Sequence, residues 1–301
     1  MQEPTGILLI DKPAGPTSHD VVDLMRRALG IRGIGHTGTL DPSATGLLIL
    51  LTGRATRLSR FFLEREKAYQ GRIKLGFATD TWDAAGKPLG EAQPVKLNAD
   101  TVAQFERRYR GEMMQMPPPF SAKKIDGVPA YKMARRGETP ALTAKRVFIY
   151  DCKFTETGAD FVDFYIKCSA GFYVRALAQE LGVALGCGGH LEKLRRIASG
   201  EFNIQDATPL DKALANPQAV IRPLEGLPLG FGQLIITPEA AVRLRNGQPL
   251  AGADVLQRET EPVETLRDLY LVRTLQAGAV GLVTRAGAQL FKPTVMFGQG
   301  E

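Results

Sequence analysis

Residues 33–52 read GIGHTGTLDPSATGLLILLT, a glycine-rich half followed by an apolar half. Four glycines and Pro42 stand within residues 33–46 and disfavour both helix and strand, so we predict a loop there. Residues 47–52 are almost entirely Leu and Ile, as in a strand buried on both faces. The stretch therefore predicts a loop held by a buried sheet, which is a common place for functional side chains.

The elements predicted around this stretch are a mixture of strands and helices. Upstream, an apolar strand over residues 6–10 precedes a helix that Ser18 caps and Gly30 ends. The apolar face of that helix consists of Val21, Val22, Met25, Ala28 and Leu29. Downstream, we expect a short basic helix through Arg60, strands over 69–77, 146–155 and 161–168, and helices over 98–109 and 172–185.

Residues 210–237 are rich in Pro and Gly and are expected to be a linker. The segment after it has short apolar runs broken by glycines, which is typical of a small β-barrel. The order of elements therefore predicts an α+β domain over residues 1–237, followed by a small β module over residues 238–301.

Composition excludes several classes of protein. The chain has 301 residues with 44% hydrophobic content, enough for one large or two ordinary domains. Its longest apolar run, residues 47–51, is too short to cross a bilayer. Three cysteines form no CxxC pair and three histidines lack metal-ligand spacing, so we expect no disulfide framework, no metal and a cytoplasmic location. Loops typical of nucleotide or dinucleotide binding are also missing from the sequence.

The net charge of +6 is unevenly distributed. Residues 238–301 contain seven basic and seven acidic side chains, so the surplus lies in residues 1–237. One basic stretch consists of Arg54, Arg57, Arg60, Arg65, Lys67, Arg72 and Lys74. The other consists of Lys123, Lys124, Lys132, Arg135, Arg136, Lys145 and Arg146. Such clusters favour a polyanion such as RNA, although scattered basic residues also simply keep a surface solvated.

Few side chains are available for chemistry. Asp41 lies in the glycine-rich loop before Pro42, where it is either a reactive carboxylate or the first residue of a turn. His36 either contacts a base or bonds to its own backbone, and Tyr69 either presents its ring to a base or belongs to the core. Arg175 either holds a carboxylate ionised or forms a surface salt bridge. An aspartate nucleophile or an acid–base pair is the chemistry that these residues allow.

Residues 35–48 resemble the signature loop of the TruB family of tRNA pseudouridine synthases. Further blocks agree in the family's order: Gly6–Pro13, Lys67–Tyr69, Gly76–Thr81, Gln115–Gly127, Cys168–Arg175 and Leu194–Arg196. The likeness covers residues 5–237, and the tail resembles a PUA-type RNA-binding module.

The resemblance implies a pseudouridine-synthase fold, with a central mixed, mostly antiparallel sheet flanked by helices. It also implies isomerisation of uridine 55 in the tRNA T-loop to pseudouridine, without a cofactor. Asp41 matches the nucleophile, Tyr69 the ring that stacks on the target base, and Arg175 the partner of the aspartate. The implied substrate-binding positions are His36, Tyr69, Tyr173, Leu194 and Lys12, the last in a motif with Pro13 that supports the site.

The implied partner is the T-arm stem-loop of tRNA, bound by a monomer that needs no obligate protein partner and no membrane. Because almost nothing precedes Gly6, we favour the stand-alone bacterial type over a relative acting on another RNA or within a guide-RNA complex. Two competing classes are a non-catalytic RNA chaperone and an RNA methyltransferase, and the sequence lacks a cofactor loop for the second. Whether Asp41 attacks uracil C6 or ribose C1′ stays open.

Overall fold

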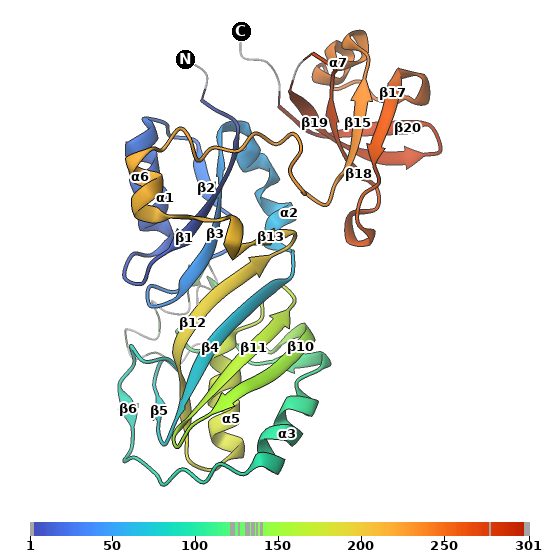
Figure 1. The fold of residues 1–301 in the computed structure, drawn as a ribbon. Coiled ribbons are helices and arrows are strands. Elements are labelled where there is room, and N and C mark those ends of the chain that lie inside the picture. Colours follow the sequence, from blue (N-terminus) through green and yellow to red (C-terminus); the bar gives the residue numbers. More distant parts are fainter. Residues whose placement is uncertain are drawn as a thin grey trace.

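The structure is a computed structural model that describes residues 3–120, 124, 125, 127–129, 133, 136, 138, 141–276 and 278–297. Its main feature is a ten-stranded mixed sheet (Figure 1). Eight strands follow in the order β14 (Thr208–Pro209), β1 (Gly6–Lys12), β3 (Thr45–Thr52), β12 (Gly189–Ser199), β4 (Lys67–Leu75), β11 (Phe161–Cys168), β10 (Lys145–Thr157) and β7 (Gly111–Gln115). In addition, β2 (Ile34–His36) pairs with β3, and β13 (Phe202–Asn203) pairs with β12. Only the pairs β1–β14 and β3–β12 are parallel, so the mostly antiparallel α+β fold is confirmed.

Strands β1 and β3 are buried on both faces, as their continuous apolar runs predict. Leu8 and Ile10 face a core formed with helices α1 (Ser18–Leu29) and α6 (Leu210–Ala215). Ile7 and Leu9 point to the opposite side, into a core that also contains Leu271 from the C-terminal part of the chain. The loop after β2 is thus attached to the most thoroughly buried strands of the protein.

The other half of the sheet, β12 to β7, has one covered and one open face. Helices α5 (Val174–Ala184) and α3 (Ala99–Arg108) pack on the covered face (Figure 1). On the open face, Arg72 donates to both carboxylate oxygens of Asp163 at 2.6 and 2.8 Å, and Lys74 pairs with Asp160. Such cross-strand pairs neutralise the open face from within the chain.

The C-terminal part forms a separate six-stranded sheet with helix α7 (Pro238–Arg245). Its order is β16 (Leu250–Ala251), β20 (Leu290–Met296), β19 (Ala279–Gly287), β18 (Leu269–Arg273), β15 (Gly232–Ile236) and β17 (Val255–Thr260). Because β15 precedes residue 238, the predicted boundary would cut this sheet. The prediction of a linker over 210–237 was wrong for α6 and β15, since their apolar residues pack into the cores on either side.

Short elements connect these parts. They are η1 (Gly53–Leu58), α2 (Ser59–Leu63), β5 (Ala78–Thr79), β6 (Pro88–Leu89), β8 (Lys124–Ile125), β9 (Val128–Pro129), η2 (Ile204–Asp206), η3 (Gly252–Asp254) and η4 (Glu264–Leu266). No helix in the described part of the chain is long and apolar enough to cross a lipid bilayer.

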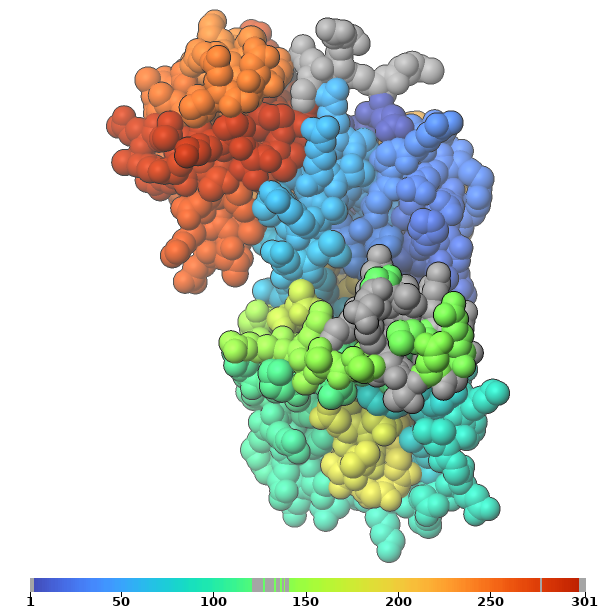
Figure 2. Space-filling view, turned by 180° about the vertical axis from the view of Figure 1, so that it is seen from behind, coloured from blue at the N-terminus to red at the C-terminus, as the bar shows by residue number. Residues whose placement is uncertain are grey.

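Most side chains of the first basic stretch contact other residues of the protein. Arg54 and Arg57 donate to carbonyls at the end of the C-terminal sheet, and Figure 2 shows that module against residues 45–63. Arg65 is 8% exposed, and its guanidinium binds Glu201 at 2.7 Å and the Leu229 carbonyl at 2.7 Å. The remaining members contact the Phe61 ring, backbone carbonyls or aspartates; they are Arg60, Lys67, Arg72 and Lys74. Most of this stretch is therefore engaged within the molecule, while Arg57 and Arg60 remain exposed.

Part of the second basic stretch, namely Lys123, Lys132 and Arg135, lies outside the described residues. Arg136 and Arg146 are largely exposed, at 67% and 74%, and contact glutamates only at 4.0 and 3.5 Å. These two arginines remain available to a polyanion because exposed pairs of this kind are weak.

Three local predictions were wrong. Thr17, not Ser18, caps α1, in a capping box with Asp20. Ala28 is exposed rather than on the buried face of the helix. Residues 34–36, predicted as loop, form β2 because they pair with the edge of β3, and this places His36 on a strand.

Candidate active site

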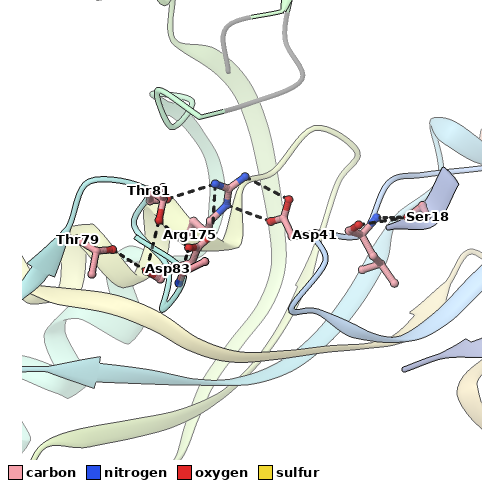
Figure 3. Close-up of polar contacts among 8 residues, drawn as sticks. Ser18, Asp41, Thr79, Thr81, Asp83 and Arg175 are labelled. Atoms are coloured by element: carbon pink, nitrogen blue, oxygen red, sulfur yellow. Dashed lines mark hydrogen bonds and ion pairs between the residues drawn. The ribbon is translucent and has the colours of Figure 1, made fainter. Parts of the chain in front are cut away.

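The loop that carries Asp41 is fastened on both sides of this residue. The Leu40 N–H donates to Ser18 Oγ at 2.8 Å, and that hydroxyl donates back to the Leu40 carbonyl at 3.2 Å (Figure 3). On the other side, the Pro42 carbonyl accepts hydrogen bonds from the Gly15 N–H at 2.9 Å and from Lys12 Nζ at 3.2 Å. Residues 12–18, which lead from the end of β1 into α1, thus fix the position of the loop.

Lys12 has no exposed surface, and its ammonium also donates to the carbonyls of Pro13 and Pro16. Burial is the main cause that lowers the Lys12 pKa, to about 8, while the nearby Asp41 carboxylate opposes it. Lys12 does not line the cavity described below, so its position supports the loop, and direct contact with substrate stays a prediction.

Arg175, in the first turn of α5, forms a fork around the Asp41 carboxylate. Its Nε lies 3.1 Å from Oδ2 and its Nη2 donates to Oδ1 at 3.4 Å. The Arg175 side chain is 10% exposed and that of Asp41 37%. The sequence predicted this pairing only through the family resemblance, and the structure brings the two residues together across 134 positions.

A second aspartate, which the sequence analysis missed, holds Arg175 from the other side. Arg175 Nη1 lies 3.5 Å from Asp83 Oδ2 and donates to the Thr81 carbonyl at 3.2 Å (Figure 3). Asp83 is itself bound by the Thr81 hydroxyl at 2.6 Å and the Ala85 N–H at 3.0 Å. Its sequence signal was its place directly after the matched block Gly76–Thr81.

Opposing forces act on the protonation of Asp41. Burial raises the pKa of its carboxyl, the Arg175 guanidinium opposes that rise, and the negative charge of Asp83 reinforces it. Arg175 therefore favours the ionised form of Asp41, while burial and Asp83 favour the neutral acid.

Asp41 opens into a cavity of about 420 Å³. The residues predicted as site residues that line this cavity are Asp41, Tyr69, Tyr173, Arg175 and Leu194. Burial raises the pKa of the Tyr69 phenol, so this side chain faces the cavity as a neutral ring. In the described part of the chain, no group of three His, Cys, Asp or Glu side chains is placed to hold a metal ion.

His36 is absent from the lining of this cavity. Its Nδ1 accepts a hydrogen bond from the Gly38 N–H at 3.4 Å. Burial lowers the His36 pKa, and the charge of Arg196 adds to that effect. His36 is therefore a neutral, half-buried ring beside the loop, and its contact with substrate stays a prediction.

Gly46 lets the loop return against β12. Its φ is +101°, and a Cβ there would lie 2.3 Å from the Arg196 carbonyl oxygen. We expect Gly46→Ala to lower the free energy of unfolding by about 2–5 kcal/mol, from backbone strain and overpacking together. Urea denaturation measures this.

Gly15→Ala is the matched control, because Gly15 has a φ of +110° and no atom within 4 Å of a Cβ. Gly15→Ala should lower the free energy of unfolding only by the cost of the backbone strain. Equal losses for the two variants would contradict the proposed collision with Arg196.

The fold is shared with solved structures of the Cbf5 type. The chain aligns with a TM-score of 0.73 and 22% identity to a chain in the structure of an H/ACA RNP bound to a substrate RNA containing 2′-deoxyuridine, covering 98% of this chain and 85% of that one. A Cbf5–Nop10–Gar1 complex gives a TM-score of 0.72 at 24% identity, covering 96% of this chain and 83% of that one.

The sequence comparisons identify the class of protein, which is a pseudouridylate synthase, an isomerase. Residues 26–174 match the N-terminal domain of TruB family pseudouridylate synthases, and residues 175–227 match the tRNA pseudouridylate synthase B C-terminal domain. More narrowly, the chain belongs to the TruB family, as the loop and the other blocks predicted.

Two relatives share this name, tRNA pseudouridine synthase B. The one from Solibacter usitatus is 40% identical over 249 residues, 81% of this chain and 85% of the relative. The one from Aquifex aeolicus is 43% identical over 229 residues, 74% of this chain and 78% of the relative.

Proposed function

We propose that this protein converts uridine 55 in the T-loop of tRNA to pseudouridine, with Asp41 as the nucleophile and no cofactor. The observation that carries the proposal is the Asp41 carboxylate, held by the Arg175 fork in a cavity that Tyr69 also lines. The names of the two relatives support tRNA as the substrate.

The chemistry is an isomerisation. The bond from ribose C1′ to uracil N1 breaks, the base turns, a bond from C1′ to C5 forms, the C5 hydrogen leaves as a proton and N1 gains one. Addition of the Asp41 carboxylate to uracil C6 or ribose C1′ divides this into easier steps, because the enzyme then holds a covalent intermediate. The uridine must first leave the T-loop stack, at a cost of a few kcal/mol.

In this proposal, stacking of the extruded base on Tyr69 offsets part of this cost. Stacking of a base on an aromatic ring contributes about 1–3 kcal/mol, and Leu194 and Tyr173 complete an apolar wall for the extruded base. The C-terminal module binds the rest of the T-arm in this proposal, and the chain acts as a cytoplasmic monomer without a protein partner.

The test is tritium release from T-arm RNA that carries [5-³H]uridine only at position 55, using the purified chain without added cofactor. We expect stoichiometric release, and none from RNA labelled only at position 54. RNA refolding without tritium release would indicate a chaperone instead. Turnover only with a methyl donor would indicate a methyltransferase, and either result would overturn the proposal.

A further inference from the structure

Arg196, on β12, contacts both sides of the Asp41 loop. Its Nε donates to the Leu47 carbonyl at 2.6 Å and its Nη2 donates to the Gly38 carbonyl at 3.2 Å. Gly38 precedes Asp41 and Leu47 follows it, so a single guanidinium binds the backbone at both ends of the loop. The side chain is 2% exposed, which makes both bonds costly to lose.

The backbone of Arg196 is engaged as well. Arg196 is the parallel partner of Gly46 on β3 and the antiparallel partner of Tyr69 on β4. Its positive charge also opposes the rise that burial causes in the pKa of the Tyr69 phenol, and both side chains line the Asp41 cavity. One residue thus connects the loop that carries the carboxylate with the ring that faces the same cavity.

The charge of Arg196 has no carboxylate partner among the described residues. No carboxylate among the residues that the structure describes lies within ion-pair distance of its guanidinium. A buried cation without a counter-ion is expensive, so the hydrogen bonds of Arg196 to the two carbonyls must offset its desolvation. An arginine is explained here by its two hydrogen bonds to the Asp41 loop and by its backbone pairing with Tyr69.

We propose that Arg196 is a positioning residue that sets the distance between the Asp41 carboxylate and the Tyr69 ring. The planar fork of the guanidinium reaches the two carbonyls together, whereas the ammonium of a lysine is a single point without that geometry. A small error in such a distance lowers the rate of the chemical step far more than it weakens binding. The inference rests on the proposed function, because it concerns the same site.

The test compares Arg196→Lys and Arg196→Met with Arg195→Met. Arg195 is the neighbouring arginine on the same strand, and its guanidinium pairs with Asp11 at 2.7 Å on the opposite face of the sheet, outside the Asp41 cavity. For Arg196→Lys we expect kcat to fall about 10- to 100-fold with KM for T-arm RNA nearly unchanged, and the urea midpoint to fall modestly with the lost hydrogen bond. Arg195→Met should keep its kcat.

Hydrogen exchange of residues 38–44, measured by mass spectrometry without RNA, provides a readout independent of turnover, because the contacts of Arg195 with this loop are at Thr45. Exchange should be faster in Arg196→Lys than in the parent or in Arg195→Met. Arg196→Met should show the larger effect, and if it does not fold, Arg196→Lys decides the matter. A normal kcat in Arg196→Lys, or equal losses in Arg195→Met, would overturn the inference.

Failure of the proposed function gives a different pattern. The unsubstituted chain would then release no tritium, while the exchange comparison would still report on the loop. Tritium release by the parent together with unaltered exchange and kcat in Arg196→Lys would leave the proposed function intact and refute only the role of Arg196.

Discussion

Asp41→Asn is expected to lower the single-turnover rate of tritium release by about 10⁴-fold or more, with little change in RNA affinity. The amide keeps the size of the carboxylate and its place beside Arg175 but cannot add to uracil or ribose as an anion. Rapid-quench assays with enzyme in excess over T-arm RNA measure the rate, and filter binding measures the affinity.

The chain offers a matched control in Asp163→Asn. Asp163 is also held by an arginine fork, that of Arg72, but on the open face of the sheet. The Asp163→Asn variant should release tritium at the rate of the parent. Near-normal turnover in Asp41→Asn would remove Asp41 from the nucleophile role, whatever the control shows.

Asp41→Asn also has a consequence for stability. Burial raises the pKa of Asp41 in the folded protein, so the contribution of this group to stability is present at low pH and is lost as the pH rises through that raised pKa. An amide does not titrate, so the urea midpoint of Asp41→Asn relative to that of the parent should rise as the pH rises through that pKa.

Replacement of Arg175 is expected to have the next largest effect. Arg175→Lys keeps a positive charge but loses the fork that reaches Asp41, Thr81 and Asp83 together, and the rate should fall by about 10²- to 10³-fold. Arg175→Gln also removes the charge that opposes the raised pKa of Asp41. The acidic limb of its pH–rate profile should therefore move to higher pH, whereas that of Arg175→Lys should move less.

The profiles are measured as single-turnover rates across the acidic to neutral range. Arg72→Gln, which breaks the comparable pair on the open face, should leave the acidic limb where it is. An unshifted limb in Arg175→Gln would mean that ionisation of Asp41 does not depend on Arg175, and the electrostatic account of the site would be wrong.

Strand β12 shows where reading the sequence fails. Its sequence GHLEKLRRIAS has no regular alternation, because two register shifts against β4 interrupt the two-residue period and because its buried face includes Arg196. The strand was therefore not predicted, although it joins the two halves of the sheet and carries Leu194 and Arg196. Asp83 was missed for a related reason, because its role is to hold Arg175, which is distant from it in the chain.

By itself, the sequence determined β1, β3, most of α1 and the family-specific loop around Asp41, because each of these depends on residues that are close neighbours in the chain. Only the tertiary structure decided that Arg175 stands between two aspartates, that Arg196 links the loop to Tyr69, and that Arg54 and Arg65 are engaged within the molecule. The physical reason is that Coulomb energy and desolvation depend on distance and burial in space, which the spacing of residues along the chain does not specify.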